Sequence, residues 1–193
     1  MVLSTGYNKI RTAVFISGSG TNLKSLIKFS KTNKSPISIE FVISNNSKAK
    51  GLDYAKKYNV KKKVLNFKNK KLTEKILLGI LKTNNIKMIC LAGFMKILSK
   101  NFIRKFNGKI LNIHPSLLPK YKGLNTHKRA LDNKEKFSGC TVHYVNSRLD
   151  SGKIILQKRV KITKNETEDT LARKILVQEH KLYPKAISKI FNH

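Results

Sequence analysis

The chain is poor in acidic residues, cysteine and proline, and it lacks tryptophan: its 193 residues include ten aspartates and glutamates, two cysteines and four prolines. No apolar run approaches the ~18 residues that can span a membrane, and the N-terminus lacks the apolar core of a secretory signal. Cys90 and Cys140 lie in apolar runs without the spacing of metal ligands. These absences predict buried free thiols, no metal, no membrane partner and a cytoplasmic protein.

The shortage of acids leaves a formal net charge of +31, from 41 basic and ten acidic side chains. Such a charge suggests a nucleic-acid partner, but 35 of the basic residues are lysine and only six are arginine. They are spread over the whole chain, whereas a specific binding face favours arginine and clusters its charge. We therefore expect compositional drift, no specific nucleic-acid partner and weak non-specific RNA binding at low salt.

Strand-like and helix-like segments alternate along most of the chain, which predicts an α/β fold with a mostly parallel sheet flanked by helices. A C-terminal antiparallel β unit, alternating and partly exposed, and a long terminal helix bent at Pro184 are expected to follow. We expect a single domain over residues 1–193, with residues 1–10 as an N-terminal extension. The expected strands are 11–17, 39–44, 60–66, 86–92, 109–114, 138–146 and 154–162. The first expected helix begins near residue 23, and the others cover 51–58, 72–83, 99–107, 127–132 and 167–191.

One apolar strand delivers two polar side chains to its carboxyl end. Asn112 and His114 are two residues apart and so project from the same face, and Pro115 then ends the strand because it has no amide hydrogen. Ligands of open α/β sheets bind at this edge. The pair therefore predicts a functional site there.

A glycine turn follows the first expected strand. Residues 18–22 read Gly-Ser-Gly-Thr-Asn and lead into a helix, so free backbone amides at the helix start can face an anion. The third glycine of a dinucleotide motif is replaced by Leu23, which favours a single phosphate group. A glycine turn that binds nothing is equally compatible with this short pattern.

Asn112, His114 and Asp150 have the chemistry for acyl transfer to an amine. An amide can stabilise the oxyanion, a histidine can move a proton near neutral pH, and a nearby carboxylate favours the imidazolium form. No serine or cysteine is paired with a base, so the transfer would be direct. The same three residues also fit a structural histidine at a strand end and an unrelated turn aspartate.

Five motifs in a fixed order carry a family resemblance. The segments are ISGSGTNL, LAGFMKILS, LNIHPSLLPKYKGLNTH, LDSG and QEHKLYP. Together they resemble phosphoribosylglycinamide formyltransferases of the folate-dependent type over residues 14–190. The resemblance implies a Rossmann-like fold and formyl transfer from 10-formyltetrahydrofolate to the amine of glycinamide ribonucleotide in purine biosynthesis. It implies small-molecule substrates and no tightly bound cofactor, with the folate as co-substrate.

The resemblance also implies site residues. Backbone amides of Gly20, Thr21 and Asn22 would hold the phosphate, and Glu179 the ribose hydroxyls. Asn112, His114 and Asp150 would be catalytic, the Leu118–Pro119 bond would be cis, and a lysine among Lys68, Lys70 and Lys71 would meet the folate tail. The folate would contact Met95, Lys96, Ile97, Leu98, Asn112, Asn146, Ser147, Arg148, Leu149 and Asp150.

Three alternatives stay open. A methionyl-tRNA formyltransferase is expected to carry a further C-terminal domain and to lack the GSGTN turn. A formyltetrahydrofolate hydrolase is expected to carry an N-terminal regulatory domain, for which the ten residues before the first strand leave no space. A non-catalytic nucleic-acid-binding module would use the positive charge. We expect a monomer or weak homodimer.

Overall fold

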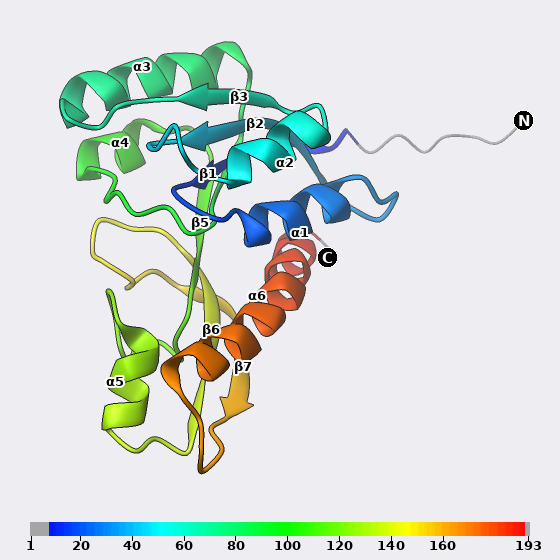
Figure 1. Cartoon of the computed structure of the whole chain (residues 1–193). Coiled ribbons are helices and arrows are strands. Elements are labelled where there is room, and N and C mark those ends of the chain that lie inside the picture. The colour runs from blue at the N-terminus through cyan, green and yellow to red at the C-terminus, as the bar shows by residue number, and fades with distance from the viewer. Residues whose placement is uncertain (1–7, 192–193) are drawn as a thin grey trace, which may run out of the picture.

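The computed structural model describes residues 8–191, and these residues build one seven-stranded sheet in the order β3-β2-β1-β4-β5-β6-β7 (Figure 1). The first five strands of the chain pair in parallel, and β6 and β7 pair antiparallel to their neighbours. The fold class is therefore as predicted. The strands are β1 (Ile10–Ile16), β2 (Ile37–Ser44), β3 (Lys61–Val64), β4 (Met88–Leu91), β5 (Lys109–His114), β6 (Phe137–Tyr144) and β7 (Ile154–Lys161).

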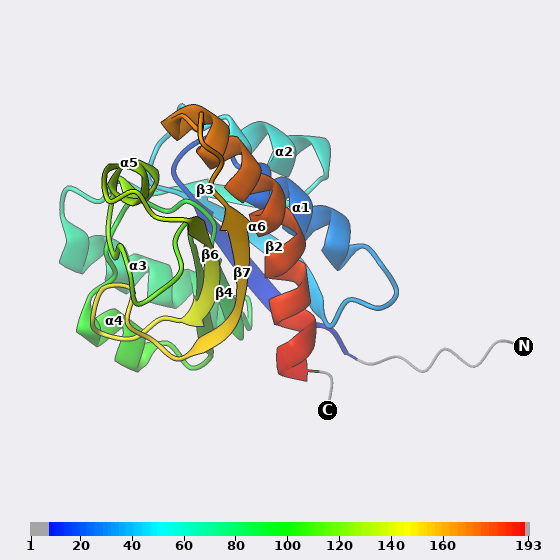
Figure 2. The same ribbon diagram turned by 90° about the horizontal axis from the view of Figure 1, so that it is seen from below.

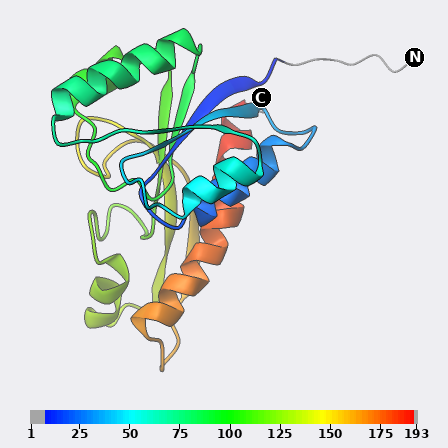
Figure 3. The ribbon, with the colours of Figure 1, turned by 45° about the horizontal axis from the view of Figure 1, so that its top comes forward.

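Helices cover both faces of the sheet. In Figures 2 and 3, α3 and α4 lie on the opposite side of the sheet from α1, α2 and the long α6. Helix α6 continues as one helix through Pro184. The expected N-terminal extension, residues 1–10, lies largely in residues 1–7, outside the described part of the chain. The helices are α1 (Thr21–Ser30), α2 (Gly51–Lys57), α3 (Lys70–Thr83), α4 (Lys100–Lys105), α5 (Thr126–Asp132) and α6 (Glu168–Phe191).

Strand β1 shows why the central strands are apolar throughout. Ala13 and Phe15 join the buried cluster under α3 and α4, whereas Val14 and Ile16 join the cluster under α1, α2 and α6. Successive side chains point to opposite faces, and both faces are covered, so no position on the strand can be polar without cost. Tyr183 of α6 is also fully buried, and its hydroxyl lies 3.1 Å from the carbonyl oxygens of Leu91 and Leu111.

The strand order reverses direction at β1, which has β2 on one side and β4 on the other. Loops leaving the carboxyl ends of two such strands part to opposite faces, and ligands bind in the space between them. The Ser17 amide donates to the Gly93 carbonyl (3.1 Å), so the turns after β1 and β4 remain joined at this edge. The active-site candidates occupy the same edge.

The predicted alternation of β6 is wrong. Six of its eight residues are buried, and only its ends reach solvent. Strands β5 and β7 flank it, α6 packs on one face, and the turn after β5 covers the other. There Thr141 Oγ1 donates to the Ser116 carbonyl (2.6 Å) and accepts from the Leu118 amide (3.1 Å). Strand β7, at the sheet edge, is partly exposed as predicted.

Candidate active site

A cavity of about 550 Å³ opens at the carboxyl edge of the sheet. Its walls come from the start of α1, the segment after β4, the end of β5, the loop joining β6 to β7, and the first half of α6. Of the predicted site residues, Gly20 and Thr21 are not in its wall. The wall does contain Asn22, Met95, Lys96, Ile97, Leu98, Asn112, His114, Asn146, Ser147, Arg148, Leu149, Asp150 and Glu179.

Asp150 joins Asn112 and His114. Asn112 Nδ2 donates to Asp150 Oδ1 (3.4 Å), and His114 Nδ1 lies 3.4 Å from Asp150 Oδ2. The carboxylate is fixed from a third side by the Gly123 amide, which donates to Oδ2 at 2.9 Å. Asp150 has a left-handed backbone (φ 44°), so the loop turns sharply where the carboxylate is presented. Asn112 and Asp150 are 38 positions apart in the chain, and the fold brings them into one group with His114.

His114 is held by an acceptor on each side of its ring. Its Nε2 lies 2.8 Å from the Tyr121 carbonyl, and its Nδ1 faces Asp150. A carbonyl only accepts hydrogen bonds, so Nε2 carries a hydrogen. The protonated ring can donate to both acceptors, and the proton shared with Asp150 is the one that can move.

His143 was not predicted, yet it belongs to the same group. Its Nδ1 lies 2.8 Å from the Tyr144 carbonyl and therefore carries the hydrogen, which leaves Nε2 to accept from Asn112 Nδ2 at 3.2 Å. Burial lowers the pKa of His143, so the neutral form is favoured. The ring thus fixes the Asn112 amide. The cross-strand register pairs Asn112 with His143 directly, and a sequence does not reveal that register.

The glycine turn is shaped for close approach of two backbones. Gly20 has φ 71°, and a side-chain carbon there would lie 2.4 Å from Gly51 Cα. The Gly51 amide donates to the Gly18 carbonyl (3.0 Å), which joins this turn to the start of α2. The first helical bond of α1 runs from the Lys24 amide to the Gly20 carbonyl. The backbone amides of the residues just before Lys24 lie at the positive end of the helix dipole and have no partner within the helix.

Asn22 connects this turn to α6. Its Nδ2 donates to Glu179 Oε2 at 2.6 Å, and both side chains are buried. Burial raises the pKa of Glu179 to about 7, although the hydrogen bond from Asn22 opposes the shift. Asn22 Oδ1 is buried without a hydrogen-bond partner among residues 8–191. The cavity wall here offers a carboxyl group that titrates near neutrality.

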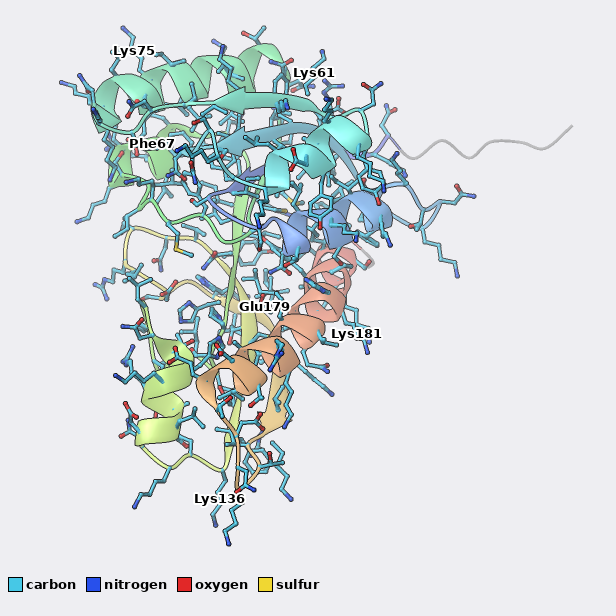
Figure 4. The ribbon with its side chains drawn as sticks, viewed as in Figure 1. Lys61, Phe67, Lys75, Lys136, Glu179 and Lys181 are labelled. Carbon is cyan, nitrogen blue, oxygen red and sulfur yellow. The ribbon has the colours of Figure 1, made fainter. Side chains whose placement is uncertain are left out.

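The other end of the cavity is apolar and open. Met95 and Ile97 are 65% and 67% exposed, and Leu149 is 53% exposed, which is unusual for such side chains. Phe94 in the same wall packs edge-on against Phe67, with ring centroids 5.5 Å apart. The loop before α3, in which Figure 4 labels Phe67, therefore supports the wall.

The cationic side chains of this open end were only partly predicted. Lys68, Lys70 and Lys71 are exposed and lie outside the cavity wall, whereas Lys96 and Arg148 are part of it. Contact of a bound anion with the first three lysines would need a ligand that extends beyond the cavity. The wall itself provides one lysine and one arginine at this position.

Two further residues of the wall were missed. His127 of α5 has its Nδ1 buried without a partner within the described part of the chain, and Glu168 begins α6. Burial lowers the pKa of His127, which the carboxylate of Glu168 opposes. His127 stands in the long motif after β5 and could have been proposed from it.

Other sequence predictions concern chemistry outside the cavity. The two cysteines are buried and free, and burial raises the pKa of both thiols to about 12, so they are poor nucleophiles. The Leu118–Pro119 bond is cis, as predicted. Within residues 8–191, no cluster of histidine, cysteine and carboxylate side chains is arranged to hold a metal, and no helix is long and apolar enough to cross a membrane.

The mostly parallel sheet and the Asn–His–Asp group at its carboxyl edge define a class of transferase. A model of the formyl transferase family matches residues 10–187. The chain belongs to this family.

Individual relatives are more specific. The chain is 39% identical over 178 residues to phosphoribosylglycinamide formyltransferase of Escherichia coli strain K12. The aligned residues make up 91% of this chain and 84% of the relative. It is 43% identical to the trifunctional purine biosynthetic protein adenosine-3 of Bos taurus, of which it spans only 18%. A crystal structure of phosphoribosylglycinamide formyltransferase from Brucella melitensis superposes with a TM-score of 0.91 at 40% identity, over 96% of this chain and 97% of that one.

Proposed function

We propose that the protein transfers the formyl group of 10-formyltetrahydrofolate to the amine of glycinamide ribonucleotide, a step of purine biosynthesis in the cytoplasm. The observation that carries the proposal is the position of the Asn112–His114–Asp150 group in the wall of one cavity, between a polar end and an apolar end. The relatives that bear the name of this activity support it.

The polar end suits the ribonucleotide. The phosphate would accept hydrogen bonds from the backbone amides of Gly20, Thr21 and Asn22 at the start of α1. The carboxyl group of Glu179 would meet the ribose hydroxyls.

The apolar end suits the folate. Its flat ring system would cover the exposed side chains of Met95, Ile97 and Leu149, which burial by a ligand stabilises. The remaining folate contacts would be Leu98 and the loop residues 146–148, together with Asn112 and Asp150. Lys96 and Arg148 are the cationic groups of this wall and would meet the carboxylates of the folate tail.

Chemistry would occur where the two ends meet. The neutral amine attacks the formyl carbon, and the carbonyl oxygen becomes an oxyanion. Asn112 Nδ2 donates one hydrogen to His143 and the other to Asp150 through a longer, weaker bond (3.4 Å), and this second hydrogen would be donated to the oxyanion instead. Protonated His114 stabilises the same charge. Asp150 accepts the proton lost by the amine. The oxyanion then collapses, the bond between the formyl carbon and the folate nitrogen breaks, and that nitrogen takes the proton from Asp150, so the protein ends unchanged.

Hydrolysis of the folate is the competing reaction in the same cavity. It needs the same oxyanion stabilisation but uses water in place of the amine. The Asn22–Glu179 pair and the glycine turn at the polar end would have no ligand in that reaction, which favours the ribonucleotide. Transfer to methionyl-tRNA would need a surface that selects RNA, and the even spread of lysine argues against one.

The deciding experiment is a two-substrate assay with the purified full chain. We expect formyl-folate consumption only when glycinamide ribonucleotide is present, with one formylated product per folate released. Folate consumption without the amine would instead identify a hydrolase. No consumption with either acceptor, from protein with an intact unfolding transition, would contradict a catalytic role.

The same assay tests two of the three catalytic candidates. His114→Ala and Asp150→Asn should each lower kcat by about a hundredfold or more while KM changes little, because they remove groups that act on the transition state. Asp132→Asn removes an exposed carboxylate of α5 and serves as the control with unchanged kcat. Wild-type turnover by either active-site variant would refute the assignment.

A further inference from the structure

A second cavity, also of about 550 Å³, lies at the other end of β6 and β7 from the active site. Its walls are the turn 117–121 after β5, the connection 133–138 between α5 and β6, and Arg159 of β7. This is the lower end of the molecule in Figure 1, and Figure 4 labels Lys136 there in the same view. Of its wall residues only Tyr121 contacts the catalytic group, through the backbone carbonyl that faces His114.

The wall of this second cavity is cationic. It contains Lys120, Lys134, Lys136 and Arg159 and a single carboxylate, Glu135. That carboxylate is already neutralised, because Lys120 Nζ (2.6 Å) and the Tyr121 hydroxyl (2.8 Å) both donate to its Oε1. The hydrogen bond from Lys120 is the main cause that lowers the pKa of Glu135. The other three cations, Lys134, Lys136 and Arg159, line the cavity as exposed side chains and give it an excess of positive charge.

The cavity also has an ordered guanidinium and an apolar wall. Arg159 lies over the Phe137 ring, with 4.1 Å from Cζ to the ring centroid, and this contact restricts the arginine to one side of the ring. An arginine held in this way can bind two phosphate oxygens at once. Phe137 is 39% exposed, and Leu117 and Pro119 extend the apolar surface beside it.

We propose that this second cavity binds a small phosphomonoester that carries a planar ring. The phosphate lies against Arg159 and Lys136, and the ring covers the apolar wall of Leu117, Pro119 and Phe137. The chemistry of the wall requires both parts of the ligand: the cations select the phosphate, and the exposed aromatic side chain selects the ring.

The second cavity shares one turn of the chain with the active site. The Tyr121 carbonyl holds His114 Nε2 at 2.8 Å, while the Tyr121 hydroxyl donates to Glu135 in the second cavity. A phosphate that draws Lys120 away from Glu135 changes a group to which Tyr121 is bonded. Occupancy should therefore lower turnover without competing with the ribonucleotide. This kinetic consequence rests on the proposed function, whereas the binding does not.

The binding is tested with adenosine monophosphate as the probe and adenosine as its uncharged counterpart. The full chain is first saturated with glycinamide ribonucleotide, so that the phosphate site at α1 is occupied, and binding is then measured by calorimetry. We expect the affinity for adenosine to be lower than that for the monophosphate by at least about tenfold, because adenosine lacks the charge-assisted contacts. Equal binding of the two probes would overturn the proposal.

Paired variants locate the site. Arg159→Ala with Lys136→Ala should weaken monophosphate binding about tenfold or more, and Arg159→Lys should weaken it less because it keeps the charge and loses the fork. Arg173→Ala with Lys185→Ala removes the same charges from exposed positions of α6 and should bind as the wild type does. Equal losses in both pairs would show attraction by net charge alone and refute a built site. Unfolding midpoints of all variants check that each one folds.

The same proteins also test the predicted effect on turnover. The monophosphate should lower kcat of the wild type and leave the Arg159→Ala, Lys136→Ala enzyme unaffected. Inhibition that is fully competitive with the ribonucleotide would contradict the link through Tyr121. A protein that binds the probe but forms no formylated product would contradict the proposed function and leave this site intact.

Discussion

Glu179 is the residue whose ordinary chemistry the fold changes most clearly. It is 7% exposed, and its one hydrogen bond from Asn22 does not offset the loss of water. A carboxyl group that titrates at about pH 7 can be present in either form in the cell. The neutral form can donate to a ribose oxygen, and the charged form can accept from a ribose hydroxyl. Position 179 is therefore sensitive to pH in a way that its sequence motif does not reveal.

The raised pKa of Glu179 predicts a pH dependence of stability. Between pH 4.5 and about 7 the folded protein keeps a proton that the unfolded chain has lost, so stability falls as pH rises through this window and is level above it. Relative to Glu179→Gln, the wild type should lose about 3 kcal/mol across the window, as an order of magnitude. Urea unfolding at several pH values measures the difference. Asp132→Asn controls for the titration of an exposed acid. If the difference in unfolding free energy between the wild type and Glu179→Gln did not change with pH, the prediction would be contradicted.

Most of the candidate site could be predicted from the residues, but its connections could not. Asn112 and His114 followed from their spacing on a strand, and Asp150 from its motif. Their contact depends on a left-handed turn at Asp150 and on the register of β5 with β6. The same register brings in His143, which stands alone in its segment and has no motif. Pair distances of this kind are set by tertiary packing, which the local pattern does not encode.

At the scale of whole elements, burial on both faces explains which predictions succeeded. Strand β4 and the second half of β1 are covered on both sides and so read as continuous apolar runs. Strand β3 is exposed throughout and reads only weakly as a strand. The error at β6 arose because one of its faces is covered by the turn 115–121, a segment without regular structure. Nothing in β6 itself predicts that cover.

Helices α3 and α4 are joined by a contact that can be tested. Ser99 caps α4 by accepting from the Phe102 amide (3.0 Å), and its own amide and hydroxyl both donate to the buried Glu74 of α3. Ser99→Ala removes the cap and one hydrogen bond from an enclosed carboxylate. We expect a loss of about 2–3 kcal/mol of unfolding free energy, measured by urea unfolding.

Two further substitutions separate that contact from a general effect of the mutation. Ser99→Thr keeps the hydroxyl and should recover most of the stability. Ser47→Ala changes an exposed loop serine and should cost less than about 0.5 kcal/mol. Equal stabilities of Ser99→Ala and Ser47→Ala would show that the link between α3 and α4 does not contribute. The segment 93–98 enters the cavity directly before Ser99, so kcat of Ser99→Ala also reports on the folate end.

For the molecule as a whole, six of the ten carboxylates are buried or paired with cations. Glu74, Asp150 and Glu179 are enclosed, and Glu40, Glu135 and Glu166 are paired with cations. The remaining lysines therefore have few partners, and Figure 4 shows Lys61, Lys75, Lys136 and Lys181 pointing outward from different sides. A charge of +31 distributed in this way opposes the compact state through self-repulsion.

That repulsion predicts stabilisation by salt. Raising sodium chloride from about 0.05 M to about 0.5 M shortens the Debye length from more than about 10 Å to about 4 Å, so the unfolding midpoint should rise. Lys61→Glu with Lys63→Glu on the exposed strand β3 should raise the midpoint at low salt and flatten its salt response. Lys61→Arg with Lys63→Arg keeps the charge and should respond as the wild type does. If the glutamate pair kept the full salt response, screening of surface charge would not be the cause, and salt would be acting through burial of apolar surface instead.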